Sequence, residues 1–167
     1  AAKRARWFAE TVAGPKTSSG TATRNSLMNE PVANLASTDR ARTDILHEYF
    51  VPADQFVAFT KACQELIPRS GQELLNITLR YVAADTTSVM SFAPAPRIAG
   101  VMSFAQLVTP EAEASMLRLT ESLIERVGAI GGSFYLPYRL HARRDQVRTI
   151  YPNTETFVAR KRHYDPN

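Results

Sequence analysis

The sequence has little of what builds cross-linked, metal-binding or membrane-spanning proteins. Its 167 residues include one cysteine and three separated histidines, which excludes an internal disulfide framework and leaves no compact cluster of metal ligands. No stretch approaches the roughly 20 consecutive apolar residues that span a bilayer, and residues 1–7 lack the apolar run of a signal peptide. We therefore expect a soluble domain without a membrane span, with the cytoplasm as the default compartment.

The familiar catalytic motifs are also missing. The chain has no dinucleotide-binding Gly-x-Gly-x-x-Gly, no phosphate loop ending in Gly-Lys-Ser/Thr and no Gly-x-Ser-x-Gly. The 20 basic and 16 acidic residues give a net charge of +4. Because the basic residues are scattered, they favour nucleic-acid binding only weakly, and we predict no nucleic-acid partner.

What is present is the composition of a globular domain, with 44% hydrophobic and 22% charged residues. Residues 14–42 are rich in Gly, Pro, Ser, Thr and Asn and predict an extended connection, preceded by a short helix at 4–12. The compact domain is expected at 43–167. Because the chain begins at Ala1 and its last four residues are a turn signal, we expect a piece of a longer protein.

Hydrophobic periodicity within 43–167 predicts strands that alternate with helices. Strands are expected at 43–51, 74–82, 89–93, 100–108 and 133–136. Helices are expected at 53–67, 110–127, 143–150 and 154–164, with Thr109 and Asn153 as caps of the second and fourth. The strands at 89–93 and 100–108 are expected to pair as a hairpin.

This order predicts an α+β fold, an antiparallel sheet covered by helices on one face with ferredoxin-like character. In the strand at 74–82, one face carries apolar residues and is expected in the core: Leu75, Ile77, Leu79 and Tyr81. The opposite face carries Asn76, Thr78 and Arg80. We expect this polar face to stay open and to meet a ligand or a second domain.

Arg80 is the strongest candidate for a functional residue. A guanidinium in the middle of a strand is costly to cover unless it meets a carboxylate, a phosphate or a developing anion. A structural salt bridge to Asp85 or Glu48 is the alternative interpretation.

The segment at 135–141 is a second candidate. It brings Tyr135, Tyr138 and His141 to the end of a strand, where functional groups often collect, although a plain surface loop is equally compatible with the pattern. Cys63 lies on the apolar side of its helix, so we predict a packed side chain and no nucleophile. The basic run at 160–163 is expected to complement the C-terminal end of a helix.

Three segments occur in a recognisable order: ILHEYFVP at 45–52, LNITLRYVAAD at 75–85 and YDP at 164–166. Together they resemble the C-terminal cap domain of FAD-linked oxidases of the vanillyl-alcohol oxidase superfamily. The Glu-Tyr-x-Val-Pro and Arg-x-x-x-x-Asp elements are most similar to the branch of sugar-lactone and alditol oxidases. The resemblance covers about residues 43–167.

The resemblance implies that this chain is the substrate-binding cap of a longer FAD-dependent oxidoreductase and is inactive alone. A separate N-terminal domain, absent here, would hold most of the FAD, and the cap would roof the flavin ring. Arg80 would point toward flavin and substrate with Asn76 beside the cofactor. Hydride transfer from an alcohol-type substrate would be assisted by His141 or Tyr138 as the base. The implied substrate contacts are Thr78, Tyr135 and Glu48.

Two departures from that branch bear on the substrate. Thr78 stands where the alditol-oxidase pattern has a glutamate, and the Gly-x-His-Trp-Gly-Lys-like segment is missing. A sugar alcohol is therefore doubtful as the substrate. The competing hypothesis is a free-standing ferredoxin-like module that binds a small ligand or RNA, or forms a homodimer, without catalysis. An RNA-binding sheet would display aromatic residues where Asn76, Thr78 and Arg80 stand.

Overall fold

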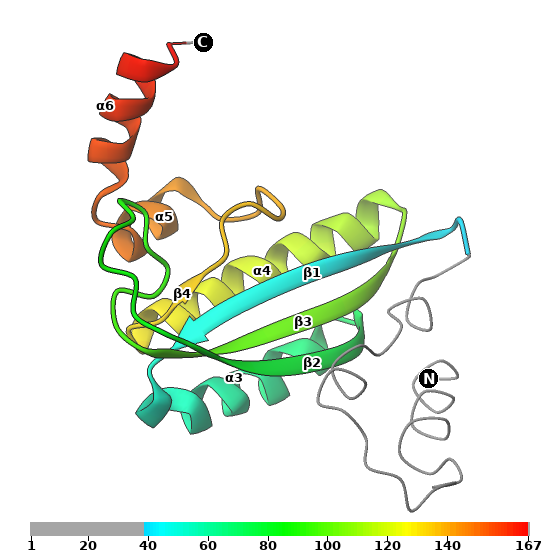
Figure 1. Ribbon diagram of the computed structural model, residues 1–167. Helices are drawn as coiled ribbons and strands as arrows, with labels where there is room; N and C mark the ends of the chain where they lie inside the picture. The colour runs from blue at the N-terminus through cyan, green and yellow to red at the C-terminus, as the bar shows by residue number, and fades with distance from the viewer. Residues whose placement is uncertain (1–38, 167) are drawn as a thin grey trace, which may run out of the picture.

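The computed structural model describes residues 39–166, so the expected helix at 4–12 and nearly all of the connection at 14–42 lie outside the described residues. In chain order the elements are β1 (Arg42–Val51), the short 3-10 helix η2 (Ala53–Gln55), α3 (Phe56–Arg69), β2 (Glu73–Val82), β3 (Arg97–Leu107), α4 (Pro110–Ala129), β4 (Ser133–Phe134), α5 (Arg144–Ile150) and α6 (Thr154–Tyr164). Figure 1 shows α3 and α4 along the sheet and α6 projecting away from it.

The four strands form one antiparallel sheet in the order β2-β3-β1-β4. Strands β1 and β3 occupy the centre and pair over their whole lengths, from Arg42 opposite Leu107 to Val51 opposite Ile98. Strand β4 adds only Ser133 and Phe134 beside β1. This arrangement confirms the predicted α+β class, while the ferredoxin-like character stays a prediction.

The core lies between the sheet and helices α3 and α4. Every second residue of β1 faces it, because alternate side chains of a strand point to the same side. Burial of this apolar surface is the main favourable contribution to folding. The buried cluster comprises Ile45, Tyr49, Val51, Phe59, Cys63, Ile67, Met102, Phe104, Met116, Leu119, Leu123, Ile124, Val127, Phe134 and Tyr151.

Helix α4 begins where its sequence predicts. The Thr109 hydroxyl accepts a hydrogen bond from the Ala112 N–H at 3.2 Å, and Pro110 occupies the first turn. Acidic residues in the first turn favour the positive end of the helix dipole. The expected cap of α6 is different, since Asn153 holds the N-cap position without a side-chain capping bond.

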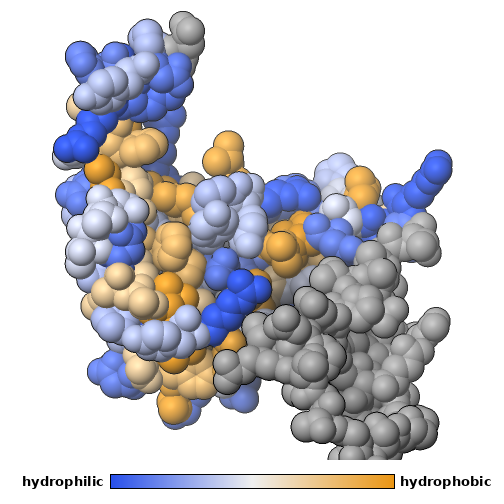
Figure 2. Space-filling model, in the orientation of Figure 1, coloured by the Kyte–Doolittle hydropathy of each residue, from blue (hydrophilic) through white to orange (hydrophobic). Residues whose placement is uncertain are grey.

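Two local predictions are confirmed. Cys63 is a buried thiol whose pKa is raised to about 12 by burial, which rules out a reactive thiolate at neutral pH. The basic residues Lys161, Arg162 and His163 lie in the last turn of α6. That helix has no buried residue, and Figure 2 shows hydrophilic residues over most of its surface.

The expected strand at 89–93 is wrong, because this stretch is part of the irregular loop between β2 and β3. Strand β3 has β2 on one side and β1 on the other, so no position beside it is left for the expected hairpin partner. The loop instead closes on its own backbone, with the Asp85 N–H donating to the Ala93 carbonyl at 2.8 Å. It also covers one end of the supposedly open sheet face, where Phe92 stacks on Phe50 with ring centroids 4.3 Å apart.

The predicted core face of β2 is also wrong in large part. Leu75 is buried, but Ile77, Leu79 and Tyr81 are 39%, 53% and 72% exposed. A bulge between Leu74 and Asn76 shifts the register of β2 against β3. Strand β2 is at the edge of the sheet, and alternation within one strand cannot reveal that α4 packs on β1 and β3.

Truncation of leucines tests this correction. Leu123→Ala removes a fully buried side chain and is expected to lower the free energy of unfolding by about 3 kcal/mol. Leu79→Ala, at a half-exposed position, is expected to cost less than about 1 kcal/mol. Urea denaturation of both variants, with the almost fully exposed Leu140→Ala as control, measures the difference. Equal losses for Leu79 and Leu123 would show that β2 is covered.

Candidate functional site

The sheet face turned away from α3 and α4 carries the polar residues predicted from β2. Thr78, Val101 and Glu48 lie opposite one another across β2, β3 and β1, so their side chains share this face. Asn76 donates from Nδ2 to the Thr78 hydroxyl at 3.3 Å. Thr78 and Arg80 are exposed. On this face β2 therefore presents exposed polar side chains, as its alternation predicts.

The segment after β4 brings two tyrosines to the same surface. The backbone N–H of Tyr135 donates to the Glu48 carbonyl at 2.9 Å, which fixes the start of this segment along the edge of β1. The rings of Tyr135 and Tyr138 meet edge to face with centroids 4.8 Å apart. Glu48 and both tyrosines also line a cavity of about 20 Å³, enough for one water molecule.

The environment of Tyr138 shows which groups surround its hydroxyl. Partial burial is the main cause that raises the pKa of Tyr138, followed by the negative charge of Glu48 and by Tyr135. The Arg80 guanidinium acts in the opposite direction, and a hydrogen bond from the Tyr138 hydroxyl to Glu48 raises the pKa further. Glu48, Tyr135 and Arg80, all predicted from the sequence, therefore lie close enough to Tyr138 to affect its pKa.

The alternative interpretation of Arg80 as half of a salt bridge is not what the structure has. Within residues 39–166, no ion pair joins Arg80 to a carboxylate. The Asp85 carboxylate accepts instead from the Thr87 N–H at 3.0 Å, the Thr87 hydroxyl at 2.9 Å and the Ser88 N–H at 3.1 Å. Hydrogen bonds from Ser88 and Thr87 hold the pKa of Asp85 below its usual range. Arg80 thus offers its positive charge to solvent and to Tyr138.

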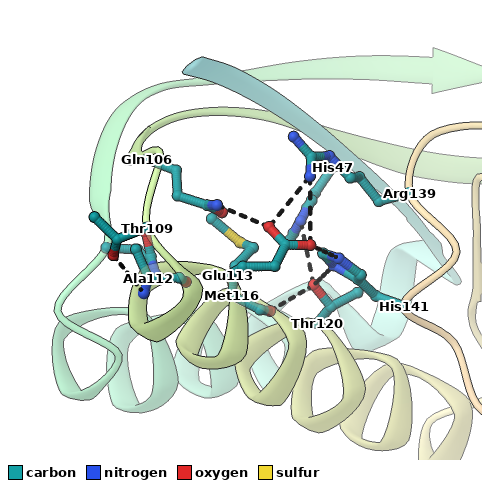
Figure 3. Close-up of polar contacts among 10 residues, drawn as sticks. His47, Gln106, Thr109, Ala112, Glu113, Met116, Thr120, Arg139 and His141 are labelled. Atoms are coloured by element: carbon teal, nitrogen blue, oxygen red, sulfur yellow. Dashed lines mark hydrogen bonds and ion pairs between the residues drawn. The ribbon is translucent and has the colours of Figure 1, made fainter. Parts of the chain in front are cut away.

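His141, on the segment after β4, lies elsewhere and is buried against helix α4 (Figure 3). Its Nε2 lies 2.7 Å from the Glu113 carboxylate and its Nδ1 lies 3.3 Å from the Thr120 hydroxyl. None of its hydrogen bonds involves Arg80 or Tyr138. The structure therefore brings Tyr138 to Arg80 and places His141 in a separate polar network.

Glu113 is the centre of that network (Figure 3). One carboxylate oxygen accepts from Gln106 Nε2 at 2.8 Å, and Arg139 Nη1 reaches both oxygens at 3.1 and 3.3 Å. The pKa of Glu113 is lowered, first by the hydrogen bond from Gln106 and then by that from His141. An ionised Glu113 therefore joins β3, α4 and the segment that carries Tyr138.

His47 extends the network into the core. The sequence analysis did not identify it as a candidate site residue. Its Nδ1 lies 3.1 Å from the Tyr49 hydroxyl and its Nε2 lies 3.3 Å from the Thr120 hydroxyl. Burial, with smaller contributions from the positive charges of His141 and Arg139, lowers the pKa of His47 to about 4. A pKa of about 4 leaves His47 neutral at pH 7.

Within residues 39–166, no group of three or more His, Cys, Asp and Glu residues is arranged to hold a metal ion. None of the helices there is long and apolar enough to cross a membrane.

Comparison with known proteins does not assign the chain to a family. No protein-family model matches the sequence, and no curated protein is significantly similar to it. The residues themselves are therefore the basis for any functional proposal.

The burial of His47 predicts how stability depends on pH. Its pKa is 6.5 when unfolded and about 4 in the folded chain, so between these values the unfolded state binds more protons and stability falls as pH falls. The full loss is about 3 kcal/mol. Glu113, whose pKa is lowered, stabilises the fold above its ordinary value of 4.5 and loses that contribution as pH falls below it, so it adds nothing to the decline between pH 6.5 and 4.5.

Urea denaturation at about pH 7 and about pH 5 measures this dependence. We expect His47→Gln to flatten the decline in unfolding free energy. His163→Gln, on the exposed end of α6, should leave it unchanged. A decline of the same size without His47 would assign the effect to other groups.

Proposed function

We propose that residues 43–167 form the cap, or substrate-binding domain, of an FAD-dependent oxidoreductase that oxidises a hydroxyl-bearing substrate. The observation that carries this proposal is the exposed Arg80 on the open sheet face, without a carboxylate partner among the described residues and next to Tyr138. The order of the three sequence segments at 45–52, 75–85 and 164–166 supports the same assignment.

The residues of this face fit a partner that gains negative charge. A guanidinium that no carboxylate neutralises can stabilise a developing anion through charge-assisted hydrogen bonds. Arg80 and Asn76 would contact the cofactor from this side, while a domain outside this chain would hold most of the FAD. FAD, when bound, would accept the hydride from the substrate C–H bond.

Tyr138 and Glu48 would handle the substrate's hydroxyl proton. A tyrosine with a raised pKa keeps its proton at neutral pH, so Tyr138 alone is a poor base. Because Glu48 lies close enough to raise the pKa of Tyr138, the hydroxyl would pass its proton to that carboxylate as it takes one from the substrate. Thr78 and Tyr135 would border the substrate, and Arg80 would stabilise its alkoxide.

The remaining sequence-predicted residue, His141, has a different role in this proposal. Its ring nitrogens are occupied by Glu113 and Thr120, so it would position the segment that carries Tyr138. Its assignment as a base stays a prediction that the second experiment below distinguishes from positioning.

The first experiment concerns Arg80. The full-length protein that contains this domain is expected to show a flavin absorption spectrum, and Arg80→Ala is expected to retain the flavin while slowing its reduction by about 10²–10³-fold. Arg118→Ala, an exposed arginine on α4, serves as the control. Unchanged reduction kinetics in Arg80→Ala would contradict the role of Arg80, and a colourless full-length protein would contradict the whole proposal.

The second experiment separates the two candidate bases. Tyr138→Phe removes only the hydroxyl and is expected to slow flavin reduction by about 10²-fold or more. His141→Ala is expected to lower the unfolding free energy by about 1–3 kcal/mol, since it leaves Thr120 and Glu113 short of a partner. The opposite result would identify His141 as the base: His141→Ala keeps the unfolding free energy of the unmodified protein and slows flavin reduction more than Tyr138→Phe does.

An alternative function is a non-catalytic module that forms a homodimer. The exposed apolar row Ile77, Leu79 and Tyr81 on edge strand β2 favours it, because such an edge can pair with another chain. This alternative predicts a colourless protein whose sedimentation shows a concentration-dependent dimer. The flavin spectrum therefore discriminates between the two functions.

A further inference from the structure

A second polar pocket lies apart from the candidate site. It has a volume of about 270 Å³ and is enclosed by the loop after β2, the turn before β4 and the connection between α5 and α6. None of Glu48, Arg80, Tyr135 and Tyr138 lines it. Arg97, the first residue of β3, forms part of the pocket wall.

The Arg97 guanidinium has spare hydrogen-bonding capacity. Its Nη1 donates to the Pro96 carbonyl at 3.4 Å and its Nη2 to the Gly131 carbonyl at 3.5 Å, both long contacts. Its Nε is buried and has no partner among the described residues. A guanidinium carries five N–H donors, and a buried donor without a partner costs free energy. The arrangement is therefore incomplete without an acceptor.

The other polar groups of the pocket do not supply that acceptor. Asp85 is the acidic residue of the lining, and its carboxylate Oδ1 is engaged by Thr87 and Ser88 within its own turn. The Ser91 and Ser133 hydroxyls donate to the carbonyls of Asp85 and Phe92. Within residues 39–166, no ion pair satisfies Arg97.

We propose that this pocket binds a small oxyanion, the carboxylate or phosphate group of a ligand, through the Arg97 guanidinium. A carboxylate or phosphate accepts two parallel N–H bonds from a guanidinium, and the two terminal nitrogens, whose present contacts are long, would donate them. The volume accommodates a small molecule of this class. This site goes beyond the oxidoreductase proposal and does not depend on it.

Nuclear magnetic resonance of the ¹⁵N-labelled chain tests the site. The chain is titrated with inorganic phosphate and, separately, with acetate at constant ionic strength, and the Arg97 Nε–H signal is followed. A saturable shift with either probe is the expected result, and the probe that binds more tightly identifies the anion class. Linear, non-saturating shifts with both probes would overturn the proposal.

Variants separate a specific site from a general charge effect. Arg97→Ala is expected to weaken binding, followed through the amide signals of Gly131 and Ser133, by at least about tenfold. Arg69→Ala removes the same charge from an exposed position on α3 and should leave it unchanged. If Arg97→Ala does not fold, Arg97→Lys takes its place. The lysine keeps the charge but loses the paired donors, so it should still weaken anion binding. Equal affinity in the Arg97 and Arg69 variants would refute the site.

Discussion

The Glu113 carboxylate joins three parts of the chain that the sheet alone would not hold together. It accepts hydrogen bonds from Gln106 of β3 and from Arg139 and His141 of the segment after β4. That segment has only two residues in the sheet, so its course depends on these side-chain contacts. Since charge-assisted hydrogen bonds are about twice as strong as neutral ones, one acidic residue can fix the position of a loop.

The network also explains how polar groups are tolerated next to the core. His47 is buried among aromatic rings, including Phe104 at a centroid distance of 5.0 Å. The Tyr49 hydroxyl can donate to its Nδ1, its Nε2–H to Thr120, and the Thr120 hydroxyl to the Met116 carbonyl. A neutral imidazole with both nitrogens satisfied avoids the cost of a buried charge.

The proposed function rests on a contrast between the two sheet faces. On the helix-covered face, His47, Thr120 and His141 form hydrogen bonds within the structure. On the other face Arg80 keeps a charge for which the described residues supply no carboxylate. A cation without its counter-ion is suited to binding, whereas one already paired is suited to holding a fold together. The Arg97 pocket follows the same principle at the end of the sheet.

The sequence by itself determined the elements that local physics controls. The helix at 110–127 could be predicted from its cap, its proline and its apolar spacing, and the polar face of β2 from simple alternation. The loop at 89–93 and the exposure of Leu79 could not be predicted, because pairing partners and edge position are set by the whole sheet. Likewise His47 meets Thr120 across 73 residues and Glu113 meets His141 across 28. Only the tertiary structure decided these contacts, since hydrogen bonds between distant segments leave no periodic trace in the sequence.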